Sequence, residues 1–340
     1  LIERCNHGIF GYSEVKTPYY EVIAKWYQEK FNWPTKKQWL VKTPGVVAAI
    51  ANAIRAFTNI GDAVLIQKPV YYPFFLTIED NQRKVVNNSL VYKNGRYEMD
   101  FVDFEEKIIS HKVKLFVLCS PHNPVGRVWN KEELLKIGDI CLKHKVIVVA
   151  DEIHADFVYH GHQHQVFANL KTDYQEITVT CTAPSKTFNI AGLQVSNIFI
   201  ANENLRKKFK QELKKTANAD INVMGLIACQ AAYSQGEDWL RQVKIYIAEN
   251  LEYVKNFLRD NLPQVKLVEP EGTYLLWLDF RELNLTEEEL EDLIINKAKL
   301  WLDGGTMFGT EGVGFQRINI ACPQKILIQA FTQLKEALKQ

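Results

Sequence analysis

Short apolar runs alternate with helical stretches through roughly the first two thirds of this chain. Strands buried on both faces of a parallel sheet read as continuous apolar runs, whereas helices repeat their apolar residues every three or four positions. The alternation therefore predicts an α/β fold in which helices flank a mostly parallel central sheet. The expected strands are 63–66, 114–119, 146–150, 177–181 and 198–201, and the expected helices are 17–31, 131–144 and the segment after Pro44-Gly45.

The pattern changes after about residue 235. A long amphipathic segment, 239–262, is followed by a mixture of short strands and helices, which is typical of a smaller α+β unit. We therefore expect a large domain over residues 1–235 and a small C-terminal α+β domain over 236–340. In the small domain the expected strands are 265–268, 273–280 and 316–320, and the expected helices lie near 287–297 and after Pro323.

The composition is that of a globular protein with ample material for a core: 340 residues, 47% hydrophobic and 24% charged. A net charge of +1 gives no reason to expect a nucleic-acid partner. The apolar runs fall far short of the ~20 residues of a membrane helix, so we expect no membrane partner. The six cysteines are scattered without a Cys-x-x-Cys pair, so we expect free thiols in a reducing cytoplasm.

Three polar residues each follow one of the apolar runs. Asp151 comes directly after one of them, and Asn123 and Lys186 follow two others after a few residues. In open α/β sheets, ligands bind beyond the carboxyl ends of the strands. The sequence therefore predicts that these three side chains meet at one edge of the sheet and form a site.

The motifs around the three residues narrow the chemistry. Asn123 lies in the run SPHNPVG, Asp151 in ADEIH and Lys186 in TAPSKTFNIAG. An amine among small and hydroxylated residues can hold an aldehyde as a Schiff base. In this order the motifs resemble those of the pyridoxal-phosphate (PLP) enzymes of fold type I, aminotransferase class I/II. The resemblance runs from His7 to the C-terminus.

This resemblance implies a role for each residue toward the cofactor. Lys186 would carry PLP as a Schiff base, Asp151 would keep the pyridine nitrogen protonated, and Asn123 would hydrogen-bond the phenolic oxygen. Tyr71 lies where the family stacks an aromatic side chain on the cofactor ring. Without the resemblance, the same residues would read as a surface lysine, a helix cap or ion-pair partner, a turn residue and a core tyrosine.

The cofactor phosphate needs free backbone N–H groups. The start of the helix expected after Pro44 supplies them at Gly45, Val46 and Val47, aided by the helix dipole. The resemblance adds the hydroxyl of Ser185. Any Pro-Gly before a helix looks alike, so this part of the site depends on the family pattern.

Two further residues are implied by the resemblance alone. Tyr12 matches a tyrosine that reaches the phosphate of the neighbouring subunit, which implies a homodimer with shared active sites. Residues 1–12 would then belong partly to an N-terminal arm or to the small domain, and since Leu1 is not a natural start we expect more of that arm before it. Arg317 matches the arginine that grips the substrate α-carboxylate with its two-pronged donors.

The chain departs from many aminotransferases at three positions. Gln194 stands where an arginine often binds phosphate, Ala183 replaces a hydroxylated residue, and His154 replaces a tyrosine three residues after the aspartate. Together with the runs EGTYLLWLD and ACP, these differences resemble the cystathionine β-lyase (C–S lyase) branch. His154 is therefore expected among the residues that surround the cofactor.

The resemblance implies a β-lyase that cleaves L-cystathionine or another S-substituted cysteine to a thiol, pyruvate and ammonia. Lys186 would remove the Cα proton, and the sulfur would leave from Cβ. The alternative is an aminotransferase that needs a 2-oxo acid acceptor. A third possibility is a regulator that keeps the fold in order to bind a protein partner, but the intact lysine, aspartate and asparagine disfavour it.

Other histidines and one carboxylate need a separate interpretation. His160, His162 and His164 alternate and could bind zinc on a strand, although a polar loop after Tyr159 is the preferred interpretation, so we expect no metal. His122 is expected to face solvent. Glu152, beside Asp151, is expected to be a helix cap or a partner in a structural ion pair.

Overall fold

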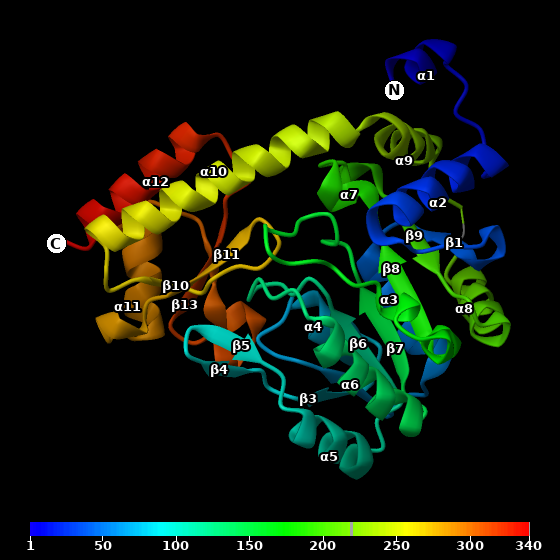
Figure 1. Cartoon of the computed structure of the whole chain (residues 1–340), viewed down its shortest axis with the longest axis horizontal. Helices are drawn as coiled ribbons and strands as arrows, with labels where there is room; N and C mark the ends of the chain where they lie inside the picture. The colour runs from blue at the N-terminus through cyan, green and yellow to red at the C-terminus, as the bar shows by residue number, and fades with distance from the viewer. Residues whose placement is uncertain (218–219, 340) are drawn as a thin grey trace.

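The computed structural model describes residues 1–217 and 220–339 of the chain, which contain a seven-stranded sheet, a four-stranded sheet and a two-stranded sheet of β4 and β5 (Figure 1). The strands are β1 (Leu40–Thr43), β2 (Ala63–Ile66), β3 (Lys84–Asn87), β4 (Val91–Lys93), β5 (Arg96–Glu98), β6 (Leu115–Cys119), β7 (Ile147–Asp151), β8 (Thr178–Thr182), β9 (Ser196–Phe199), β10 (Lys266–Leu267), β11 (Leu275–Asp279), β12 (Asp303–Gly304) and β13 (Phe315–Asn319). The helices are α1 (Ile2–His7), α2 (Thr17–Phe31), α3 (Val46–Phe57), α4 (Pro73–Asp80), α5 (Phe101–His111), α6 (Lys131–Lys143), α7 (Pro184–Thr187), α8 (Glu203–Lys215), α9 (Val223–Gln235), α10 (Glu237–Asn261), α11 (Glu287–Asp292) and α12 (Gln324–Ala337).

The larger sheet has seven strands in the order β1-β9-β8-β7-β6-β2-β3. The five strands from β8 to β3 are parallel to one another, whereas β9 runs antiparallel to both of its neighbours. The predicted mostly parallel sheet is therefore confirmed. Each predicted strand of this sheet lies within two residues of an observed one, and the predicted helix 17–31 coincides with α2.

Helices cover both faces of this sheet. On one face α3, α4 and α8 pack against apolar side chains of the central strands, among them Val149 and Val179. On the other face α5 and α6 cover residues such as Phe116 and Val148, and α2 and α9 pack together over β9. Both faces are thus buried, which explains why the central strands are apolar at nearly every position.

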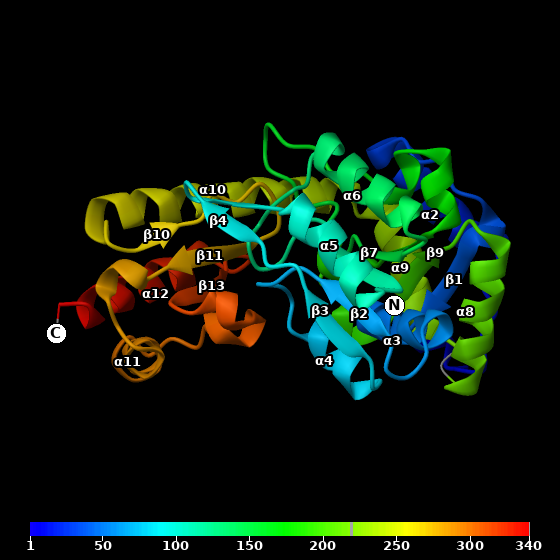
Figure 2. The same ribbon diagram turned by 90° about the horizontal axis from the view of Figure 1, so that it is seen from below.

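The smaller sheet is antiparallel, with the order β10-β11-β13-β12, and it lies beside the large sheet at the left of Figure 2. Side chains of β11 alternate between two cores. Leu276 and Leu278 pack under α10 and α12, whereas Trp277 points the other way and joins the core that contains α5 and α6. The long helix α10 runs across both parts of the molecule in Figure 1. The predicted division near residue 235 falls between the two sheets and stays a prediction.

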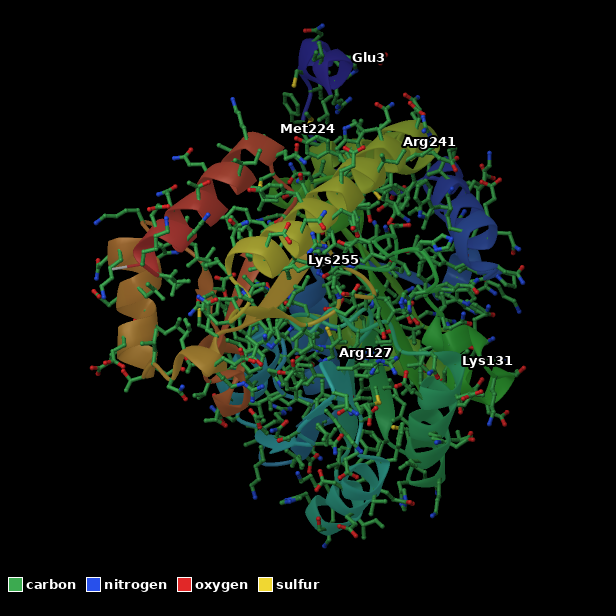
Figure 3. All side chains as sticks on the ribbon, turned by 60° about the vertical axis from the view of Figure 1, so that its left-hand side comes forward. Glu3, Arg127, Lys131, Met224, Arg241 and Lys255 are labelled. Atoms are coloured by element: carbon green, nitrogen blue, oxygen red, sulfur yellow. The ribbon has the colours of Figure 1, made fainter. Side chains whose placement is uncertain are left out.

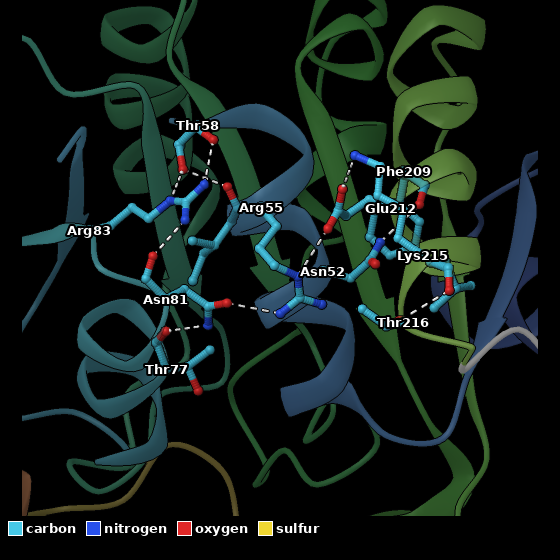
Figure 4. Close-up of polar contacts among 12 residues, drawn as sticks. Asn52, Arg55, Thr58, Thr77, Asn81, Arg83, Phe209, Glu212, Lys215 and Thr216 are labelled. Atoms are coloured by element: carbon cyan, nitrogen blue, oxygen red, sulfur yellow. Dashed lines mark hydrogen bonds and ion pairs between the residues drawn. The ribbon is translucent and has the colours of Figure 1, made fainter. Parts of the chain in front are cut away.

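A polar network fixes α3 to the helices beside it (Figure 4). Asn52 donates to the carbonyl of Phe209 on α8 at 2.9 Å. Arg55 donates to Glu212 of α8 at 3.2 Å and to Asn81, at the end of α4, at 2.9 Å. These contacts hold the helix whose first turn faces the candidate site described below.

The helix α1 buries none of its residues and lies away from the body of the molecule in Figure 1. All six cysteines are free thiols, as predicted. Within residues 1–217 and 220–339, no helix is both long and apolar enough to cross a membrane.

Candidate active site

The carboxyl ends of β6, β7 and β8 lie side by side, as the sequence predicted. The parallel register places Cys119 opposite Asp151, and Asp151 opposite Cys181. The chain then turns at each strand end and delivers one predicted residue: Asn123 after β6, Asp151 as the last residue of β7, and Lys186 on α7 after β8. The convergence inferred from the apolar runs is therefore present in the fold.

A cavity of about 360 Å³ opens at this edge of the sheet. Its walls contain every predicted site residue except Tyr12, namely Gly45, Val46, Val47, Tyr71, Asn123, Asp151, His154, Ser185, Lys186 and Arg317. A neighbouring cavity of about 540 Å³ shares the walls formed by Lys186, Tyr274 and Asn319. The predicted residues thus surround one space large enough for a small ligand.

The amine of Lys186 lies among largely buried groups. Burial lowers its pKa, the positive charge of Arg317 lowers it further, and the negative charge of Asp151 opposes both effects. A lysine with a lowered pKa is neutral, and hence nucleophilic, in a larger fraction of molecules near neutral pH.

The carboxyl group of Asp151 is buried at the floor of the site. Burial raises its pKa to about 7, although a hydrogen bond from the backbone N–H of Ile153 at 3.1 Å and the charge of Lys186 both favour the ionised form. A carboxylate held in this way gains from a cationic partner in the cavity, because the partner offsets the cost of its burial.

His154 lines the same cavity and is 4% exposed. Its Nδ1 atom is buried and has no hydrogen-bond partner among the described residues. Burial lowers the pKa of His154 to about 3, and the charges of Lys186 and Arg317 lower it as well. The imidazole is therefore neutral, with a buried ring nitrogen that a ligand could satisfy.

The first turn of α3 faces the cavity through Gly45, Val46 and Val47. No side chain caps this helix end. Its first N–H groups consequently remain available to a ligand, and the helix dipole favours an anion there. The hydroxyl of Ser185 lines the cavity as well.

Arg317 and Asn123 contact each other across the cavity. Nη1 of Arg317 donates to Oδ1 of Asn123 at 2.8 Å. This bond occupies the amide oxygen of Asn123 and leaves its amide nitrogen as the donor for a ligand. Since Arg317 comes from β13 and Asn123 follows β6, the contact joins the two parts of the chain at the site.

A buried ion-pair cluster holds the loop that carries Asn123. Arg127, 1% exposed and in the interior of the molecule (Figure 3), donates from Nε to Glu271 at 2.9 Å and from Nη2 to both carboxylate oxygens of Glu133 at 2.9 Å. The backbone N–H groups of Glu271 and Gly272 also donate to the carbonyl of Gly126. The loop is therefore attached to the segment that precedes β11.

The structure corrects the prediction for His122 in the same loop. His122 was expected to face solvent, but it is 1% exposed and its Nε2 lies 3.3 Å from the carbonyl of Gln67. Burial lowers the pKa of His122 to about 3. The loop is polar in sequence, yet the ring of His122 packs edge-on against the ring of Trp129, with 5.7 Å between the ring centres.

The other histidines and Glu152 divide into exposed and buried groups. His160 and His162 are exposed in a turn, whereas His164 is buried and its Nε2 lies 3.1 Å from Glu152. Glu152 also accepts from the N–H of Phe167 at 2.9 Å, so its predicted structural role is confirmed. Among the described residues, no group of three or more His, Cys, Asp or Glu side chains is placed to hold a metal ion.

Tyr12 lies outside the cavity, on the segment between α1 and α2, and it is fully exposed. The predicted contact with a neighbouring subunit therefore stays a prediction. The sequence did not single out Tyr72, Cys119 and Tyr274 as site residues, although all three line the cavity. The available signals were that Tyr72 adjoins Tyr71, that Cys119 ends the predicted strand 114–119, and that Tyr274 lies in the run EGTY.

Comparisons with known proteins agree with this geometry. The family described as aminotransferase class I and II matches residues 6–333. The chain is 43% identical to cystathionine beta-lyase PatB of Bacillus subtilis (strain 168) over 338 residues, which covers 99% of this chain and 87% of the relative. Two solved structures have a TM-score of 0.97 and cover 99% of this chain. One is a PLP-bound putative aminotransferase from Clostridium difficile 630, 42% identical with 87% of that chain covered. The other is cystalysin from Treponema denticola, which contains a PLP cofactor, 39% identical with 86% covered.

Proposed function

Since this chain belongs to the aminotransferase class I and II family, we propose that it is a PLP-dependent C–S β-lyase. Its substrates would be L-cystathionine or other S-substituted cysteines, and its products a thiol, pyruvate and ammonia. The observation that carries the proposal is the single cavity lined by Lys186, Asp151 and Arg317. The relative named cystathionine beta-lyase, at 43% identity, favours cleavage over amino transfer.

The residues of the cavity fit the cofactor. Lys186 supplies the amine for covalent attachment, Asp151 the carboxylate for the pyridine nitrogen, and Asn123 an amide donor for the phenolic oxygen. Tyr71 offers an aromatic face to the ring. The unpartnered Nδ1 of His154 is a further polar group that a bound ring could satisfy.

The phosphate would bind at the free N–H groups of Val46 and Val47 and at the hydroxyl of Ser185. Gln194, at the position where many relatives have arginine, is exposed and carries no charge. We propose that Tyr12 of a second subunit completes the phosphate site in a homodimer. Its full exposure in the single chain is consistent with this role.

Bound PLP supplies an electron sink for the negative charge that develops at Cα of the substrate. Arg317 holds the α-carboxylate with N–H groups that Asn123 and its other neighbours do not use. The amine of Lys186, whose pKa is lowered by burial, takes the proton from Cα. The sulfur then leaves from Cβ as a thiolate, because a thiolate is a good leaving group.

The proposal is tested by incubating the PLP-loaded protein with L-cystathionine in the absence of any 2-oxo acid. We expect sustained release of pyruvate and free thiol in equal amounts. A parallel sample receives a 2-oxo acid, and its rate should be unchanged. If turnover stops after one equivalent and resumes only with the added acid, the protein is an aminotransferase.

The raised pKa of Asp151 gives a pH-dependent prediction for the cofactor-free protein. Its carboxyl titrates near 7 in the folded chain and near 3.9 when unfolded, so between these values the native state binds more protons and loses stability as pH rises. The variant Asp151→Asn has no carboxyl that can ionise at this position, so its stability does not fall in this way as the pH rises. We expect it to be more stable than wild type by a few kcal/mol near pH 8 and nearly equal near pH 4, as measured by urea unfolding.

A matched control comes from Asp139, on the surface of α6. The hydrogen bond from Lys171 lowers the pKa of Asp139, so the sign is reversed: Asp139→Asn should lose stability at neutral pH and not in acid. If the free energy of unfolding of Asp151→Asn relative to wild type increased as the pH falls, the pKa of Asp151 would not be raised in the folded chain, and the prediction would be wrong.

A further inference from the structure

Arg317 has an acidic partner that the proposed function does not use. The two-residue strand β12 pairs antiparallel with β13, and this register places Asp303 directly opposite Arg317. Oδ2 of Asp303 accepts from Nε of Arg317 at 3.1 Å and also from Nη2. One carboxylate oxygen thus occupies the whole Nε side of the guanidinium.

The remaining contacts of Arg317 hold the guanidinium on two more sides. Nη1 donates to Asn123, and the group lies over the ring of Phe308 with its carbon 4.9 Å from the ring centre. Three of the five N–H groups are therefore used, and one N–H on each terminal nitrogen remains. A guanidinium binds a carboxylate through two parallel hydrogen bonds when each of two neighbouring nitrogens contributes one N–H group.

The contact with Asp303 is partly shielded from solvent. The side chain of Arg317 is 14% exposed and that of Asp303 is 36% exposed. Without the aspartate, the Nε side of a largely buried cation would have no partner, and the guanidinium could rotate to offer that side to a ligand instead.

We propose that Asp303 is a positioning residue that selects α-amino acids through their carboxylate. Its contact with Nε fixes the plane of the Arg317 guanidinium, so that only the side formed by the two terminal nitrogens, Nη1 and Nη2, faces the cavity. The bond from Nη1 to Asn123 fixes the position of that side. This inference rests on the proposed function, since it concerns the same substrate site. It adds that recognition of the carboxylate depends on a residue that itself never touches the substrate.

L-Alanine and ethylamine make a matched pair of probes, because they differ only in the carboxylate and neither has a leaving group at Cβ. Their dissociation constants are measured with the PLP-loaded protein from the change in cofactor absorbance. For Asp303→Ala we expect the constant for L-alanine to rise about 10- to 100-fold, the range of a charge-assisted hydrogen bond. The constant for ethylamine should change less than about 3-fold.

Asp303→Asn keeps an oxygen that can accept from Nε and nearly the same shape, so it serves if the alanine variant fails to fold. We expect an intermediate loss of L-alanine affinity, several-fold in size. The control Glu282→Gln removes an exposed ion pair with Lys266 in the same part of the chain and should change neither constant.

The same variants are then assayed for pyruvate release from L-cystathionine. For Asp303→Ala we expect a higher KM, with kcat reduced less than about 3-fold. Suppose that wild type releases pyruvate. If Asp303→Ala then has the wild-type dissociation constant for L-alanine, or if its constants for L-alanine and ethylamine rise by the same factor, the inference is wrong and the proposed function stands. If wild type carries PLP but releases no pyruvate, the proposed function is wrong, and the L-alanine constants still decide the role of Asp303.

Discussion

Replacing Lys186 by alanine is expected to lower the rate of pyruvate release by about 10⁴-fold or more. The substitution removes the only lysine in the cavity of the described chain, and with it both the covalent attachment of the cofactor and the base for the Cα proton. Folding should change little, because no hydrogen bond or ion pair of the Lys186 amine occurs among the described residues. Borohydride reduction followed by peptide mass analysis should place the cofactor on residue 186 of wild type only.

Lys42 provides a matched control for this experiment. It is also partly buried, and burial lowers its pKa as it does that of Lys186. Lys42 does not line the cavity, however. We expect Lys42→Ala to keep its cofactor and most of its activity. Activity that survives in Lys186→Ala, or cofactor attached elsewhere in wild type, would contradict the assigned role.

Removing the guanidinium of Arg127 is expected to have the largest effect on stability. In Arg127→Met, the largely buried carboxylate of Glu133 loses its one cation partner among the described residues, and that of Glu271 keeps only Arg96, which together costs about 3–5 kcal/mol of unfolding free energy. The carbonyl of Tyr97 also loses a donor. Urea unfolding followed by circular dichroism measures the loss.

Two comparisons make this result specific. Arg241 forms an exposed ion pair with Asp238, so Arg241→Met should cost less than about 1 kcal/mol. Adding Glu133→Gln to Arg127→Met removes the carboxylate that is left without a cation and should recover part of the stability, as a double-mutant cycle would show. Equal losses for Arg127→Met and Arg241→Met would mean that the buried cluster is not needed for the fold.

Local sequence patterns were sufficient for the elements that bring the site together. The apolar runs before Asn123, Asp151 and Lys186 proved to be neighbouring parallel strands, because a run that is apolar on both faces fits only the middle of a covered sheet. The helix 17–31 was predicted to the residue, since Thr17-Pro18 marks its start and its apolar spacing is regular.

Features that depend on distant parts of the chain were not predictable in this way. The edge strands β3, β4 and β5 have three or four residues each and little apolar character, so they give no clear period. The contact of Asp303 with Arg317 arises from a two-residue strand in a glycine-rich stretch. His122 was placed wrongly because its polar surroundings in sequence do not reveal that its ring contacts Gln67, 55 residues earlier in the chain.

The pairing of β1 with β9 has a consequence for synthesis on the ribosome. Thr43 pairs with Ser196, so the first strand waits for roughly 150 further residues before its neighbour exists. At about 5–20 residues per second this interval lasts on the order of 10 to 30 s. During that time α3 lacks its contacts with α8, including the hydrogen bond from Asn52 to the carbonyl of Phe209. β1 therefore joins the sheet only after residue 199 has emerged, and α3 stays without α8 until about residue 215, which is the interval when the nascent chain is most exposed to aggregation.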